Sequence, residues 1–187
     1  MSSTTNSHIG TSTVYTIKIC GSLGATTQTL TFSISDNSIG FGTLSSSAAQ
    51  YATGDTLGSA SEVEAHQLTA NTNAGSGYTI TVQGATLTNG SYTVTAIGAV
   101  NTASSVGTEQ FGLRMTATGG VGTVTSPYAA AGFAYAGTAS TPSQVASAST
   151  GDGVTTTYSV RYLGNIAGNT ETGSYTTNLV YVATANF

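Results

Sequence analysis

The sequence predicts an all-β protein, an antiparallel β-sandwich of about nine or ten strands. Three observations lead to this fold class. Apolar residues recur with a period of two in most segments, which is the pattern of half-buried strands. The 24 glycines, two prolines and many threonines favour strands and tight turns. No segment has the periodicity of an α-helix longer than a turn or two, so two packed sheets of the immunoglobulin-like or jelly-roll-like kind are the simplest architecture.

Length and composition suit a single folded domain. The 187 residues lie within the range of one-domain sandwiches. A hydrophobic share of 39% provides a core and argues against disorder. Residues 1–12 are small and polar without periodicity, so we expect a flexible N-terminal segment followed by one sandwich domain over residues 13–187.

The first half of the chain is expected to hold five strands. The first alternates Tyr15, Ile17 and Ile19 against polar neighbours, and the second bends at a glycine-rich segment before continuing. Asn89-Gly90 is a turn dipeptide, which predicts a hairpin between the last two strands of this half. Residues 45–60 are expected to form a loop. The strands cover residues 14–20, 28–35 continuing to 39–44, 61–70, 78–82 and 91–97.

The second half ends in a long strand. Strands are expected at 109–117 and 154–163, separated by an excursion over 121–149 with one or two short strands. Residues 173–187 alternate as one terminal strand, whose apolar face is expected to belong to the core. We expect this strand to pair with residues 14–20, from the same chain or a neighbour, and with residues 154–163. The apolar face comprises Tyr175, Leu179, Tyr181 and Phe187.

The charge excludes several classes of partner. The net charge is -4, and the basic residues are Lys18, Arg114 and Arg161. These cannot neutralise a phosphate backbone or an acidic membrane surface, so nucleic acid is not expected as a partner. No apolar run approaches the ~20 residues that cross a bilayer, so direct membrane insertion is not expected. Cys20 is the only cysteine and is interpreted as a small buried hydrophobe.

The surface composition predicts an extracellular or cell-surface location. Only 5% of residues are charged, against a usual ~25%, so threonine, serine and asparagine must cover the surface. Residues 1–8 lack the basic and apolar regions of a signal peptide. We expect that a signal was removed ahead of this sequence; the alternative is a protein that is not exported.

No residue pattern indicates an enzyme. Serine catalysis needs a histidine base, and the histidines are His8 in the N-terminal segment and His66 on a strand. No phosphate-binding loop is present and no tryptophan lines a sugar cleft, so neither catalytic residues nor a cofactor are expected. Asp36, Asp55 and Asp152 are isolated in turns, where aspartate caps the backbone.

Two further sites have structural alternatives. Glu62, Glu64 and His66 share one strand face and could offer metal ligands, but adjacent polar side chains usually mark a solvent face, which we prefer. Lys18 would lie opposite Asn178 if the first and last strands pair. Some bacterial pilus proteins join such a pair by an amide bond, whereas a single exposed lysine is the alternative. Intact mass tests the cross-link, because its formation releases ammonia.

Three short patterns carry a resemblance to known families. They are Ile39-Gly-Phe-Gly-Thr-Leu44, Gly77-Tyr78-Thr79-Ile80 and Leu179-Val180-Tyr181. Together they resemble the WxL-like domains of secreted bacterial surface proteins, with tyrosine in place of both tryptophans. The final strand is also similar to that of TasA-like and spore-coat-U-like fibre subunits. The resemblance implies an exported β-sandwich with a structural or adhesive role.

The resemblance also implies a mode of assembly. In TasA-like fibres one subunit lends an extended strand to the next. Residues 1–20 suit that role here, with Val14, Tyr15, Ile17 and Ile19 as the candidate assembly strand; the alternative is a first strand folded into its own domain. We therefore expect a non-enzymatic, self-associating subunit of a bacterial surface fibre or layer. The alternative is a module that binds peptidoglycan or another surface glycan through Tyr51, Tyr128, Phe133 and Tyr135.

Overall fold

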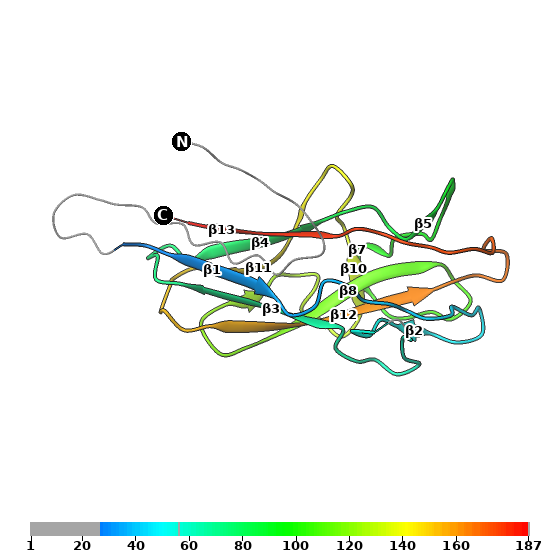
Figure 1. Cartoon of the computed structure of the whole chain (residues 1–187), viewed down its shortest axis with the longest axis horizontal. Coiled ribbons are helices and arrows are strands. Elements are labelled where there is room, and N and C mark those ends of the chain that lie inside the picture. Colours follow the sequence, from blue (N-terminus) through cyan, green and yellow to red (C-terminus); the bar gives the residue numbers. More distant parts are fainter. Residues whose placement is uncertain (1–26, 56, 187) are drawn as a thin grey trace.

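The computed structural model describes residues 27–55 and 57–186. The secondary-structure elements among these residues are all β-strands. Two antiparallel sheets pack face to face, which confirms the predicted β-sandwich (Figure 1). The described residues contain 13 strands rather than nine or ten, because four of them are only two residues long. Such short pairings leave too little alternation to be seen in the sequence.

The larger sheet has seven strands. Its centre is the long antiparallel pair β12 and β8, which stays in register from Thr157 opposite Thr118 to Asn165 opposite Gln110. β2 pairs with β12 beyond the end of β3. The order is β1 (Leu30–Ile34), β3 (His66–Thr72), β12 (Thr156–Asn165), β8 (Gln110–Thr118), β10 (Phe133–Tyr135) and β7 (Gly98–Thr102), with β2 (Gln50–Tyr51) off this path.

The smaller sheet covers the core from the other side. Its order is β13 (Val180–Ala185), β4 (Tyr78–Gln83), β11 (Ser143–Ala148) and β9 (Thr123–Val124). A separate two-stranded ribbon joins β5 (Thr88–Asn89) to β6 (Tyr92–Thr93) at one end of the molecule. Gly90 closes this ribbon with a φ of 59°, so the predicted Asn89-Gly90 turn is confirmed.

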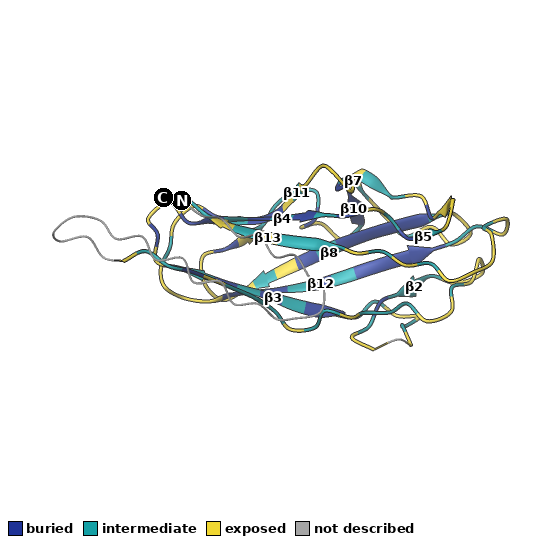
Figure 2. Cartoon of the chain, turned by 45° about the horizontal axis from the view of Figure 1, so that its top comes forward, coloured by how far each residue is buried: buried dark blue, intermediate teal, exposed yellow. Residues whose placement is uncertain are grey.

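Alternation along the strands separates the core from the surface. The inward residues of β4, β8 and β12 are almost fully buried, as predicted for the latter two (Figure 2). Outward positions carry small polar residues that align across strands: Ser33 lies opposite Thr69, Thr69 opposite Thr157, and Thr157 opposite Thr118. These hydroxyls take the place of surface charge, which explains how so few ionisable residues suffice.

Tyrosine hydroxyls connect the two sheets through the core. Tyr158 of β12 hydrogen-bonds Tyr78 of β4 at 2.8 Å, and Tyr162 of β12 hydrogen-bonds Tyr181 of β13 at 2.5 Å. Tyr135 of β10 donates to the carbonyl of Gly84, just after β4, at 2.8 Å. A buried hydroxyl without a partner is costly, so each pair favours one alignment of the sheets over its alternatives.

Three predictions about pairing are wrong. Within the described residues 173–186 only 180–185 form a strand, and it pairs with β4 rather than with residues 154–163, because β3 and β8 occupy both edges of β12. Residues 78–82 and 91–97 do not form a hairpin, since β4 lies between β13 and β11. The excursion over 121–149 contains three strands rather than one or two: β9 and β11 pair in the small sheet, and β10 pairs in the large sheet.

Two predicted strands are shorter than expected. Residues 39–44 form no strand; their one backbone bridge joins Gly40 to Thr53, and Ile39 and Phe41 pack against the core. The strand predicted over 61–70 begins at His66. The predicted loop 45–60, in turn, contains β2. The aspartate prediction is confirmed: Asp36, Asp55 and Asp152 each accept a backbone N–H two residues further on, at 2.8–2.9 Å.

Candidate site for strand addition

One side of the sandwich is bounded by two edge strands. Among the described residues β1 pairs only with β3, and β13 pairs only with β4. β1 and β13 contact one another across the sandwich and lie side by side along its long axis (Figure 1). We call this side, formed by residues 30–41 and 175–185, the β1–β13 edge.

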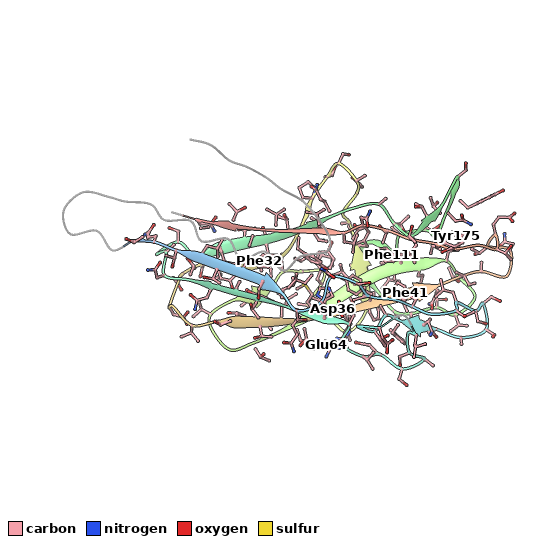
Figure 3. The ribbon with its side chains drawn as sticks, viewed as in Figure 1. Phe32, Asp36, Phe41, Glu64, Phe111 and Tyr175 are labelled. Carbon is pink, nitrogen blue, oxygen red and sulfur yellow. The ribbon has the colours of Figure 1, made fainter. Side chains whose placement is uncertain are left out.

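The β1–β13 edge has an apolar interior. Apart from the buried Leu30, the side chains that its two segments direct toward the core are partly buried, whereas those of the central strands are almost completely buried. Three of its aromatic residues, Phe32, Phe41 and Tyr175, are spread along the long axis of the molecule together with the buried Phe111 (Figure 3). The partly buried set is Phe32, Ile34, Ile39, Phe41, Tyr175, Leu179, Tyr181, Ala183 and Ala185.

Neither edge strand carries a device that discourages pairing. Natural sheets guard their edges with lysine, proline, bulges or very short strands, because an edge exposes a row of unpaired N–H and C=O groups. β1 reads LTFSI and β13 reads VYVATA, without charge or proline, and both keep an uninterrupted register with their neighbours. Both strands therefore offer a regular template to a further strand.

The opposite side of the sandwich differs. Its edge strand in the large sheet, β7, has an interrupted register with β10, and its edge strand in the small sheet, β9, is two residues long. A surface depression there is lined by Met115, Thr116, Ala117, Gly122, Thr123, Val124 and Ala129, none of which is ionisable. The described strands of this side offer no long regular edge, and the lining of the depression offers no group for acid, base or metal chemistry.

The predicted assembly strand, Val14, Tyr15, Ile17 and Ile19, lies outside the described residues, as does Lys18. Just before β1, the backbone N–H of Thr29 donates to Asn73 Oδ1 at 2.7 Å. Asn178 is exposed just before β13. The Lys18–Asn178 cross-link therefore stays a prediction.

His66 lies beneath the β1–β13 edge. It is 4% exposed, hydrogen-bonds the Tyr162 hydroxyl through Nε2 at 2.9 Å, and packs edge-on against the Tyr181 ring at 5.9 Å. Its Nδ1 has no hydrogen-bond partner among the described residues. Burial lowers the pKa of His66 from 6.5 to about 4, and the Gln67 backbone and the Asp36 and Glu64 carboxylates oppose this only in part. His66 is thus neutral near pH 7.

The predicted face of Glu62, Glu64 and His66 does not exist as a site. Glu62 and Glu64 precede β3, and Glu62 pairs with Arg114 at 2.5 Å and Arg161 at 3.4 Å. Glu64 instead accepts from Gln67 Nε2 at 2.9 Å, while His66 points into the core. No group of three metal-ligating side chains occurs in residues 27–55 and 57–186. The solvent-face interpretation is wrong for His66.

The predicted ligand surface is also wrong. Tyr128, Phe133 and Tyr135 are at most 2% exposed. Tyr135 packs against Phe111 in the core, and the half-buried Tyr51 packs against Phe133 with ring centroids 5.9 Å apart. Phe133-Ala134-Tyr135 is a core strand within the excursion over 121–149, for which one or two short strands are predicted from the sequence. The short alternation Phe133, Tyr135 was the only signal available.

No protein-family model, curated protein or solved structure matches the chain. The part of the chain that the structure describes contains no helix of the length and apolarity needed to cross a membrane.

Proposed function

We propose that this protein is a non-enzymatic structural subunit of a bacterial surface fibre or surface layer and is located outside the cell. It polymerises when a strand from a neighbouring copy adds to the β1–β13 edge. The observation that carries the proposal is the pair of regular, unguarded edge strands with an apolar interior between them. The proposed incoming strand is residues 14–20, whose apolar positions are Tyr15, Ile17 and Ile19.

The chemistry of the two partners matches. An added strand gains main-chain hydrogen bonds along one edge, and its alternate side chains enter the apolar interior. The proposed donor strand, with seven residues, is similar in length to β1, with five, and β13, with six. Burying three large apolar side chains contributes about 5–9 kcal/mol before the cost of ordering the donor.

The charge distribution supports a role in assembly rather than catalysis. Both described arginines are engaged by Glu62, and Asp36, Asp55 and Asp152 each cap a local turn. Polar, uncharged outer faces suit close packing of identical copies, since like charges do not accumulate when subunits stack.

Deletion of residues 1–20 tests the proposal. The full chain is expected to form filaments visible by electron microscopy, and the deletion variant is expected to remain monomeric and to bind a peptide of residues 13–21. A control peptide with Ile17→Asp and Ile19→Asp should not bind, because each carboxylate would enter the apolar interior. A full chain that stays monomeric at all concentrations, with a deletion variant of unchanged stability, would refute strand donation.

The glycan-binding alternative has lost its aromatic contact surface, since three of its four residues lie in the core. Sedimentation with peptidoglycan separates the two functions: a binding module pellets as a monomer, whereas the proposed subunit does not.

A further inference from the structure

β13, one of the two strands of the β1–β13 edge, is linked to the large sheet through a short chain of hydrogen-bonded side chains. Tyr181 of β13 hydrogen-bonds Tyr162 of β12, which hydrogen-bonds His66 of β3. The rings of His66 and Tyr162 are stacked, with centroids 5.6 Å apart. β13 pairs with only one strand, β4, among the described residues. The Tyr181–Tyr162–His66 hydrogen bonds therefore add to a single ladder of main-chain hydrogen bonds in holding β13 in place.

We propose that His66 is an acid-sensitive switch that holds β13 against the large sheet while neutral and releases it when protonated. This inference deepens the proposed function, on which its biological consequence rests, because β13 is one template for the incoming strand. Loss of β13 order would weaken assembly in acid.

The protons in the network explain the switch. In neutral His66, Nε2 can accept from Tyr162, whose oxygen then accepts from Tyr181, so every hydroxyl proton is used. Protonated His66 must donate from both nitrogens. Nε2–H then donates to Tyr162, Tyr162 donates to Tyr181, and the Tyr181 proton loses its acceptor. The N–H at Nδ1 has no hydrogen-bond partner among the described residues in either state, because a neutral imidazole that accepts at Nε2 carries its proton on Nδ1. The new costs of protonation are therefore the lost acceptor of Tyr181 and the buried positive charge.

The surroundings compensate the new charge only in part, because the Gln67 backbone and two carboxylates favour the protonated form less than burial disfavours it. The groups that face His66 are the Tyr162 hydroxyl on β12, the Tyr181 hydroxyl on β13, and the Asp36 and Glu64 carboxylates on the segments after β1 and before β3. Asp36 is already bonded to the Ser38 backbone and Glu64 to Gln67. Asp36 and Glu64 lie near the middle of the molecule in Figure 3. An imidazolium is therefore best stabilised by water, and water reaches it most easily if β13 moves.

The size of the effect follows from the two states of His66. Its pKa is about 4 in the closed structure and 6.5 when exposed to water. Opening of β13 should therefore become about twentyfold more favourable between pH 7 and pH 5.

Amide hydrogen exchange on the full chain, at a concentration where it is monomeric, tests the inference. Protection of residues 180–185, corrected for intrinsic exchange, should fall about twentyfold from pH 7 to pH 5 while the β8–β12 pair keeps its protection. His66→Phe and His66→Gln should abolish this pH dependence. An equal loss in either variant, or none in the unmodified chain, would overturn the switch.

Two further readouts keep the inference independent of folding defects and of the assembly proposal. If neither variant folds, an NMR titration of the His66 imidazole in the unmodified chain decides, and a midpoint near 6.5 overturns the switch. Exchange at β13 is measured without filaments, so failure to polymerise refutes the proposed function alone. If filaments form, those assembled at pH 7 should dissociate at pH 5, and those of His66→Phe should persist.

Discussion

Replacement of Tyr158 by phenylalanine tests whether paired hydroxyls hold the two sheets in alignment. Tyr158 and Tyr78 are both buried, come from opposite sheets and hydrogen-bond at 2.8 Å. Burial raises the pKa of Tyr158 well above its ordinary value, and the bond with Tyr78 adds to the effect. The Tyr158 hydroxyl also contacts the hydroxyl of Thr156, which accepts from the Gly122 backbone at 3.0 Å.

The two single substitutions should differ in cost. Tyr158→Phe leaves the buried Tyr78 hydroxyl without its hydrogen-bond partner, which costs about 2 kcal/mol. Tyr78→Phe should cost only about 1 kcal/mol, because the Tyr158 hydroxyl keeps its contact with Thr156. The double variant should be less destabilised than the sum of the singles by about 1 kcal/mol, since removing both hydroxyls leaves neither orphaned.

Equilibrium unfolding in urea measures these free energies, with the slope m required to stay constant. A loss of 2 kcal/mol lowers the midpoint of thermal unfolding by about 4–8 °C for a chain of this size. Tyr92→Phe, at a side chain 54% exposed, is the matched control and should change nothing. Additive single effects, or a larger loss for Tyr78→Phe than for Tyr158→Phe, would refute the assignment of the pair.

Three further predictions concern charge, packing and alkaline pH. Glu62→Gln should cost about 1 kcal/mol of stability, because Arg114 and Arg161 lie directly opposite one another and lose their shared carboxylate. High salt should recover part of this loss. Glu64→Gln is the control, and equal effects of the two substitutions in urea unfolding would contradict the pairing. Gly122→Ala should cost more than 2 kcal/mol in the same assay, because its Cβ would collide with the Tyr158 and Tyr78 hydroxyls. Gly75→Ala is the control, since no atom lies within 4 Å of the added Cβ. Similar stabilities of the two variants would contradict the prediction. Burial raises the pKa values of four core tyrosines, so their stabilising effect is complete below pH ~10 and is lost as the pH rises further; they are Tyr135, Tyr158, Tyr162 and Tyr181. Ultraviolet titration should show these tyrosines ionising together with unfolding. Smooth ionisation near pH ~10 in the folded state would contradict the prediction.

The sequence by itself determined which faces of β8 and β12 are buried. The alternation of Phe111, Leu113 and Met115, and of Tyr158, Val160 and Tyr162, was sufficient because successive side chains on a strand point to opposite sides whatever its neighbours are. The turn aspartates and the Asn89-Gly90 turn were equally predictable, because their geometry depends on residues two or three positions away.

Pairing was decided only in the tertiary structure. A period of two assigns a face to a strand but not a neighbour, so residues 173–187 could not show that their strand would pair with β4. The burial of His66 depends on Tyr162, 96 residues away, and on Tyr181. The edge positions of β1 and β13 among the described residues are likewise a property of the assembled sheets, because the sequence of a strand does not show which of its sides a neighbour will occupy.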